Sequence, residues 1–173
     1  MTVPAIHAHR GSPDPASGVR ENTLEAFYRA RLLGADGVEL DVRRTADGAL
    51  VVHHDPEIRG VGPIHELASD QLPESVPLLS AALDACQGLD LTIELKNLPG
   101  EPGFDPDEVM AREVADLVVA SGRRDTVVVS SFWPGSLGAV RQRRPQLATG
   151  LLVASWFDPV SYTHLTLPTI YSV

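Results

Sequence analysis

Acidic residues and histidines recur at the ends of short apolar segments along the first part of this 173-residue chain. Glu39 and Asp41 flank a single leucine, and on a β-strand this spacing places both carboxylates on the same face. Two carboxylates that face a core repel each other unless a cation lies between them. Oxygen ligands favour Mg²⁺ or Ca²⁺ over zinc. With Glu94, which ends a later apolar segment, they predict a metal site; a solvated edge strand is the alternative interpretation.

Two histidines are candidates for acid–base chemistry, because imidazole titrates near neutral pH. His9 and His54 each end an apolar segment, so we expect both to face the predicted metal site. His7 has the same parity as His9 but lies one layer deeper, and His53 has the parity that faces away. We therefore interpret His7 and His53 as packing residues.

Two cationic residues accompany the acids. Arg10 and Lys96 either form ion pairs with these carboxylates or bind a phosphate, for which arginine offers a planar fork and lysine a point charge. Asn22 is expected to cap the helix that follows it, and Glu21 is placed to orient Arg10 or a ligand.

Composition limits the class of partner. The net charge of −9 argues against nucleic acid as a partner and is compatible with binding a cation, which a phosphate substrate would then need as a bridge. Cys86 is the single cysteine, which favours a reducing compartment. The first residues leave no room for a signal peptide, and no apolar run approaches the roughly 20 residues of a membrane span. We therefore expect a cytoplasmic protein without stable membrane insertion.

Strand and helix patterns alternate along the chain, which implies parallel strands joined by right-handed crossovers. The polar residues follow successive strands at their carboxyl ends, as in barrel active sites, whereas an open sheet focuses ligands at one switch point. The sequence therefore predicts an α/β fold of the TIM-type (β/α) barrel class. The predicted strands are residues 5–9, 37–43, 50–54, 91–96, 126–130 and 149–153, and the predicted helices are 22–33, 78–86, 105–120 and 135–144.

The order and spacing of these segments resemble the glycerophosphodiester phosphodiesterase family. The resemblance extends from about residue 5 to 153 and is carried by residues 9–11 (HRG), 21–23 (ENT), 34–42 (GADGVELDV), 47–48 (DG), 51–55 (VVHHD) and 93–96 (IELK). It implies a TIM-type barrel hydrolase that uses a divalent cation to convert glycerophosphodiesters to glycerol 3-phosphate and an alcohol. Residues 56–77 form a shorter loop than is usual in the family, which leaves the alcohol undetermined.

The resemblance also assigns roles to individual residues. It implies that Glu39, Asp41 and Glu94 bind the metal, that His9 and His54 act as general base and acid, and that Arg10 and Lys96 bind the phosphate. Two alternatives stay open at this point. One is a lysophospholipase D-like or phospholipase C-like enzyme, and the other is an inactive cation-binding fragment.

The end of the chain does not follow the barrel pattern. A complete barrel needs roughly 250 residues, and we count six of eight strands by residue 153. We therefore expect an incomplete barrel in residues 1–160, with exposed sheet edges and weak or no activity as an isolated chain. Residues 161–173 have no helical or clear strand period, and we interpret them as an irregular, non-native tail.

Overall fold

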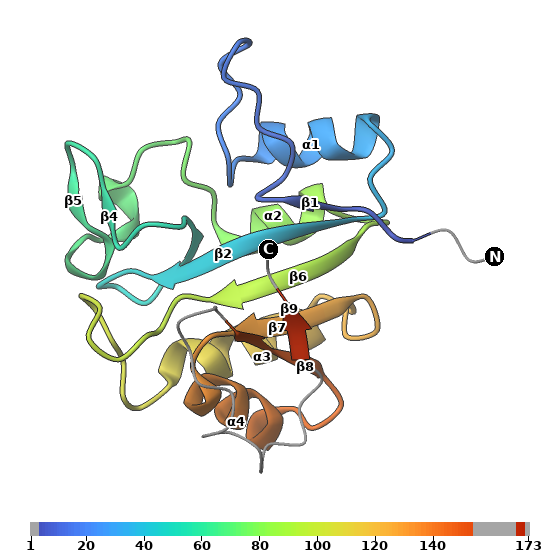
Figure 1. Cartoon of the computed structure of the whole chain (residues 1–173). Helices are drawn as coiled ribbons and strands as arrows, with labels where there is room; N and C mark the ends of the chain where they lie inside the picture. Colours follow the sequence, from blue (N-terminus) through green and yellow to red (C-terminus); the bar gives the residue numbers. More distant parts are fainter. Residues whose placement is uncertain (1–3, 154–168, 172–173) are drawn as a thin grey trace.

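A curled sheet of parallel strands forms the centre of the molecule (Figure 1). The computed structural model describes residues 4–153 and 169–171. Hydrogen-bonded neighbours follow the order β1-β2-β6-β7-β8-β9, and every pair along this path is parallel. The strands are β1 (His7–His9), β2 (Gly37–Arg44), β6 (Asp90–Leu95), β7 (Val127–Ser131), β8 (Ala148–Val153) and β9 (Thr169–Tyr171). This arrangement confirms an incomplete TIM-type barrel.

In the described part of the chain, four α-helices connect the parallel strands and pack on one face of the sheet (Figure 1). They are α1 (Leu24–Leu32), α2 (Leu79–Ala85), α3 (Val109–Ala120) and α4 (Pro134–Arg143). Thr23 caps α1, because its hydroxyl accepts a hydrogen bond from the Ala26 N–H at 3.2 Å. In α3 the capping group is the carboxylate of Asp105, which accepts from the Val109 N–H at 2.5 Å. None of the described helices is both long and apolar enough to cross a membrane.

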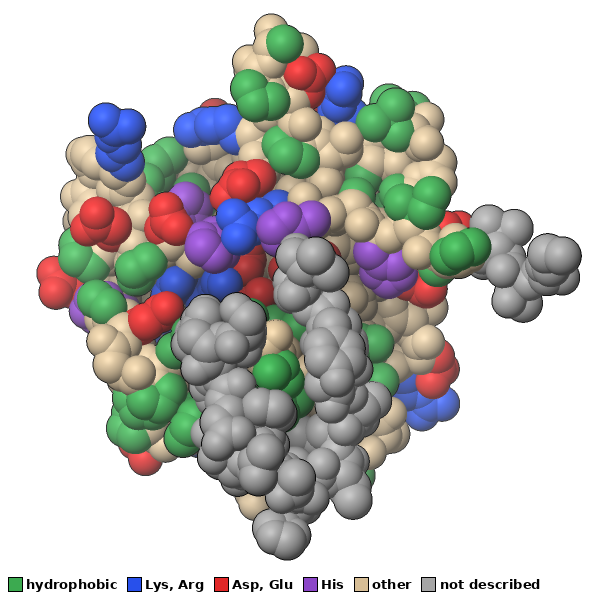
Figure 2. Space-filling view, in the orientation of Figure 1, with side chains coloured by type: hydrophobic (Ala, Val, Ile, Leu, Met, Phe, Trp, Pro, Cys, Tyr) green, Lys and Arg blue, Asp and Glu red, His purple; other side chains and the backbone are tan. Residues whose placement is uncertain are grey.

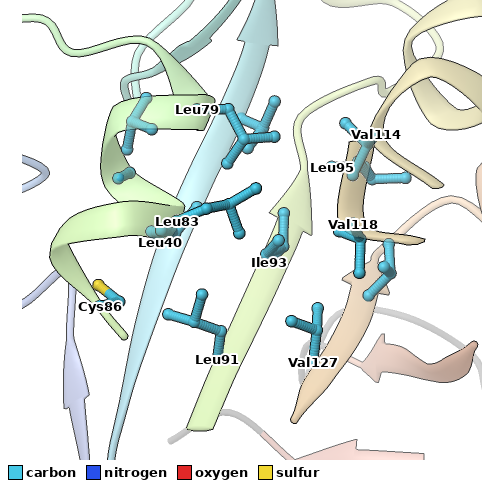
Figure 3. Packing of buried hydrophobic residues seen from close by; sticks show 14 of the residues in the cluster. Leu40, Leu79, Leu83, Cys86, Leu91, Ile93, Leu95, Val114, Val118 and Val127 are labelled. Carbon is cyan, nitrogen blue, oxygen red and sulfur yellow. The ribbon is translucent and has the colours of Figure 1, made fainter. Parts of the chain in front are cut away.

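The hydrophobic core lies between the sheet and these helices. Leu79 and Leu83 of α2 point toward Leu40 and Ile93 of the sheet, and α3 covers the next strands in the same way (Figure 3). In β2, residues Val38, Leu40 and Val42 are fully buried on this helical face. The residues that alternate with them must therefore point to the opposite face, the barrel interior. The predicted apolar alternation of this strand is confirmed.

The third predicted strand is wrong as a barrel strand. Residues Leu50–Val52 form β3, which runs antiparallel to β2, with Val42 opposite Val52. A parallel crossover needs a dozen or more residues, whereas only residues 45–49 separate the two strands. Gly48, with φ of +87°, lies in this tight turn. His54 therefore follows a hairpin strand that leaves the end of β2.

The segment after β3, predicted as a loop, is a small substructure beside the carboxyl ends of the strands (Figure 1). It contains β4 (Glu57–Ile58), which pairs antiparallel with β5 (Gly62–Pro63), and the short 3₁₀ helices η1 (Ile64–Glu66) and η2 (Ser69–Gln71). Ile58 and Ile64 pack with Val51 in a separate buried cluster. Asp47 joins the turn to η2, because its carboxylate accepts a hydrogen bond from the Ser69 hydroxyl at 2.7 Å.

The terminal stretch predicted to be irregular contains a strand. In β9, Thr169 lies opposite Leu151 and Tyr171 opposite Val153, so the expectation of no strand is wrong for Thr169–Tyr171. The remainder of the predicted tail lies outside the described residues. The division at residue 160 and the foreign origin of residues 161–173 stay predictions, which the structure does not test.

Replacing Gly11 by alanine is expected to destabilise the folded protein. Its φ is +83°, and an added Cβ would lie 2.8 Å from the Ala26 Cβ and 2.9 Å from the Ala26 carbonyl carbon. We expect Gly11→Ala to lower the free energy of unfolding by about 2–5 kcal/mol, from left-handed strain of about 1–2 kcal/mol and overpacking of about 1–3 kcal/mol. Urea denaturation measures this change.

Gly18→Ala is the matched control, since Gly18 has φ of +81° but no neighbouring atom within 4 Å of an added Cβ. It should show the backbone strain alone. Equal losses in the two variants would contradict the predicted close packing of the residue 9–11 turn against α1.

Candidate active site

Three carboxylates meet at the carboxyl ends of β2 and β6. Glu39, Asp41 and Glu94 each offer an oxygen, and these oxygens lie within 4.8 Å of one another. The register of the sheet brings two of them together, because Asp41 and Glu94 are directly opposite each other on adjacent parallel strands. Asp41 is fully buried and Glu94 is 8% exposed. The interpretation of Glu39 and Asp41 as solvated acids on an edge strand is therefore wrong.

Crowding and burial oppose the ionisation of these acids. Burial, followed by the nearby charge of Asp41, raises the pKa of Glu39 from 4.5 to about 8. Burial also raises the pKa of Glu94, against the opposing attraction of Lys96. The buried Oδ1 of Asp41 accepts no well-aligned hydrogen bond from the described residues, although the Lys96 ammonium lies 3.2 Å from it. A hard divalent cation would satisfy that oxygen and remove the repulsion, so the donor set fits such an ion.

Two cationic side chains lie against the carboxylates. The Lys96 ammonium is 2.7 Å from Glu94 and 3.2 Å from Asp41, and the Arg10 Nε is 3.3 Å from Asp41. The Arg10 backbone N–H also donates to Glu39 at 3.0 Å, from a residue with φ of +54°. Glu21 accepts from the Arg10 guanidinium at 2.9 Å, as the sequence suggested. The predicted ion pairs of Arg10 and Lys96 with these carboxylates are therefore formed.

The two candidate imidazoles lie near different acids of the site, His9 near Glu39 and His54 near Glu94. His9 Nε2 is 3.8 Å from Glu39 Oε2, and its side chain is 71% exposed. His54 is near enough for its charge to lower the pKa of Glu94, after the larger effects of burial, Lys96 and Asp41. His54 Nδ1 lies 2.7 Å from an Asp55 carboxylate oxygen, which leaves Nε2 available for proton transfer. Figure 2 shows histidine, basic and acidic side chains gathered in one region of this face.

The other two histidines lie away from the acids. The exposed ring of His7 packs over Gly37, where an added Cβ would be 2.6 Å from the ring. His53 is partly buried, and burial lowers its pKa. Its backbone N–H donates to the Asp41 carbonyl at 3.0 Å, so it ties the hairpin to β2.

Asn22 contacts Asp41 and does not have the capping role expected from the sequence. Asn22 is 3% exposed and does not cap α1, since Thr23 has that position. Its amide Nδ2 donates to Asp41 Oδ2 at 2.8 Å, and its Oδ1 accepts from the Asp41 N–H at 3.3 Å. The φ of +55°, which asparagine tolerates better than most residues, directs the side chain inward. Two consecutive cap-type residues, Asn22 and Thr23, were the available signal.

Known proteins are similar to this chain in sequence and in fold. The family model of the glycerophosphoryl diester phosphodiesterase family matches residues 9–159. The chain belongs to this family. Relatives include glycerophosphodiester phosphodiesterases from Caldanaerobacter subterraneus, 31% identical over 85% of this chain and 65% of the relative, and from Bacillus altitudinis, 30% identical over 95% and 71%. The chain therefore spans slightly less than two thirds of the first relative.

A solved family structure has the same fold. The crystal structure of a glycerophosphodiester phosphodiesterase from Parabacteroides distasonis superimposes with a TM-score of 0.81 at 26% identity. The match covers 96% of this chain and 72% of that one. The family expected from the sequence is therefore confirmed, together with its barrel fold.

Stability of the cation-free protein should fall as pH rises. The folded pKa of Glu39, about 8, exceeds the ordinary value of 4.5, so the protonated carboxyl stabilises the folded state below pH 4.5. That contribution is lost as the pH rises through about 8. Urea denaturation between pH 5 and 9 in the presence of a chelator measures the decline.

Glu39→Gln should make the curve flatter, because the amide does not titrate. Glu74→Gln, which changes an exposed acid away from the three carboxylates, should leave the curve as it is. The same slope in both variants would mean that Glu39 ionises normally.

Proposed function

We propose that the chain catalyses the metal-dependent hydrolysis of glycerophosphodiesters to glycerol 3-phosphate and an alcohol. The observation that carries the proposal is the meeting of Glu39, Asp41 and Glu94 within 4.8 Å. Imidazoles and cationic groups lie beside these acids, in a chain that belongs to the glycerophosphoryl diester phosphodiesterase family. The chain spans 65% of the first relative, so the activity of that longer protein is proposed for this chain on the basis of its own site residues.

In the proposed site the three carboxylates hold Mg²⁺ or Ca²⁺. A cation held there would stabilise the negative charge that develops on the phosphate oxygens during the reaction. Lys96 and Arg10 contact Asp41 at 3.2 and 3.3 Å. Their remaining N–H groups donate hydrogen bonds to the non-bridging oxygens of the phosphate. Asn22 keeps the Asp41 carboxylate oriented, because its Nδ2 donates to Asp41 Oδ2 while its Oδ1 accepts from the Asp41 backbone N–H.

His9 and His54 carry the protons in this proposal. One imidazole takes the proton of the attacking hydroxyl, and the hydroxyl oxygen bonds to phosphorus. If water attacks, glycerol 3-phosphate forms directly; if the glycerol 2-hydroxyl attacks, a cyclic phosphate forms, and a water molecule then opens it to glycerol 3-phosphate. The bond between phosphorus and the alcohol oxygen breaks, and the other histidine, as imidazolium, gives its proton to the departing oxygen. Asp55 accepts from His54 Nδ1, which fixes the tautomer and leaves Nε2 to act.

Identification of the product tests this function. The chain is mixed at high concentration with glycerophosphocholine and either Mg²⁺ or Ca²⁺, and phosphorus NMR follows single turnovers. We expect glycerol 3-phosphate to form with the cation and not with a chelator. Phosphocholine as the product would indicate cleavage on the other side of phosphorus. Cation-dependent stabilisation without any cleavage would support an inactive cation-binding fragment instead.

A further inference from the structure

A cavity of about 210 Å³ opens beside the proposed catalytic groups. Its walls come from residues 20–23, from the end of the β3 hairpin, from the β4–β5 turn and from residues 73–76. We call this space the alcohol cavity.

The alcohol cavity shares its inner wall with the proposed active site. His54 lines it directly. Glu21 and Asn22 also line it, and these residues bond to Arg10 at 2.9 Å and to Asp41 at 2.8 Å, respectively. A group that leaves the phosphate on the His54 side therefore enters this space. If His54 is the proton donor, its imidazole meets the departing oxygen at the entrance.

The charges that line the alcohol cavity are mainly positive. Arg20 and Arg59 line it, and among the described residues neither guanidinium has a carboxylate oxygen within 4.0 Å. The acid in this wall, Glu21, is already paired with Arg10. Other described arginines also lack a carboxylate partner, but Arg20 and Arg59 are the two that line this cavity beside the proposed active site. Arginine forks match phosphate oxygens in geometry and charge.

The rest of the lining suits the carbon body of an alcohol. Ile58, Val61 and Val76 supply apolar surface, and Val61 is 44% exposed although it is a large aliphatic side chain. A cationic alcohol such as choline gains nothing from two guanidinium groups. A neutral glycerol leaves them without a partner. A phosphate monoester, with a charge of about −1.5 to −2 at pH 7, balances both.

We propose that the alcohol cavity selects glycerophosphodiesters whose leaving alcohol carries a second phosphate. The inference rests on the proposed function and adds the substrate class to it. Arg20 and Arg59 are its specificity residues, because they bind the distal phosphate and do not touch the reacting one. The apolar wall holds the carbon skeleton between the two phosphates.

Two substrates that differ by one phosphate test the proposal. Glycerophosphoinositol and glycerophosphoinositol 4-phosphate share the glycerol, the reacting phosphate and the ring. We expect kcat/KM to be at least about tenfold higher for the phosphorylated compound, mainly through KM, since one charged hydrogen-bonded contact is worth about tenfold or more. Arg20→Gln and Arg59→Gln should each reduce this ratio about tenfold. Arg112→Gln, on the outer helix α3, should leave the ratio unchanged.

A binding measurement separates this inference from the proposed function. Calorimetric titration with inositol 4-phosphate in the presence of Mg²⁺ should show binding that Arg59→Gln weakens about tenfold and Arg112→Gln does not. If neither substrate is cleaved while this binding persists, the hydrolase proposal fails and the phosphate-binding cavity stands. If both are cleaved with equal kcat/KM and the arginine variants do not change the ratio, the cavity proposal is overturned and the hydrolase proposal stands.

Discussion

Asp41→Asn should abolish the response of the protein to divalent cations. Asparagine keeps the shape of the side chain and can still accept from Asn22, but it removes the central negative charge of the three acids. Changes to groups that merely support metal ligands typically cost 10–100-fold in affinity. For this ligand we therefore expect a loss of more than about 100-fold, measured by calorimetric titration with Mg²⁺ and Ca²⁺ and by the cation-induced rise in Tm.

The variant has a second, independent readout. The charge of Asp41 is the second cause of the raised pKa of Glu39, so Asp41→Asn should lower that pKa from about 8. The pH-dependent loss of stability then begins at a lower pH. Asp84→Asn, on the exposed side of α2, makes the same charge change and should alter neither property. Undiminished cation affinity in Asp41→Asn would contradict the proposed metal site.

His54→Ala should slow the cleavage of glycerophosphocholine by about 10²–10⁴-fold, which corresponds to about 3–5 kcal/mol of activation free energy. The loss arises because the variant lacks the imidazole that transfers the proton. The Asp55 carboxylate holds this imidazole in place through its 2.7 Å contact with Nδ1, and no other described side chain has that contact. Single-turnover rates at saturating cation, with glycerol 3-phosphate as the measured product, give the size of the effect.

Two controls identify the origin of that loss. Cation affinity in His54→Ala should stay within about threefold of the unchanged chain, because the imidazole is not one of the three oxygen ligands. His7→Ala, which removes an exposed imidazole from β1 two residues before His9, should cleave at the normal rate. A near-normal rate in His54→Ala would exclude this histidine as the general acid or base.

The parts of the fold that could be predicted are those for which local pattern decides. Leu40 between Glu39 and Asp41 fixed which side chains share a face, and the buried Leu40 confirms that alternation. Strand direction is different, because β3 has the same apolar composition as a parallel strand. Only the length of the connection from residue 45 to 49 distinguishes the two cases, and that length was the signal overlooked.

In the candidate site, too, local pattern predicted some features, whereas others depend on tertiary packing. The sequence placed three acids, two histidines and two cationic residues at strand ends, and the structure brings the acids, Arg10 and Lys96 into direct contact. The partner of Asn22 was not predictable, because it lies 19 positions away and depends on how the turn before α1 meets β2. The alcohol cavity likewise depends on the packing of residues 56–77, for which no periodic pattern exists.

The short hairpin that ends at His54 has a consequence for how this protein can diverge. The His53 N–H bonds to the carbonyl of Asp41, so backbone pairing sets the spacing between the imidazole and the carboxylate. The segment that begins two residues later packs on the hairpin through Ile58 and Ile64, but the tip of its β4–β5 turn, residues 59–61, takes no part in that cluster. Insertions or replacements there can alter which alcohols are accepted while the reacting groups keep their relative positions, so chemistry and substrate range can evolve separately.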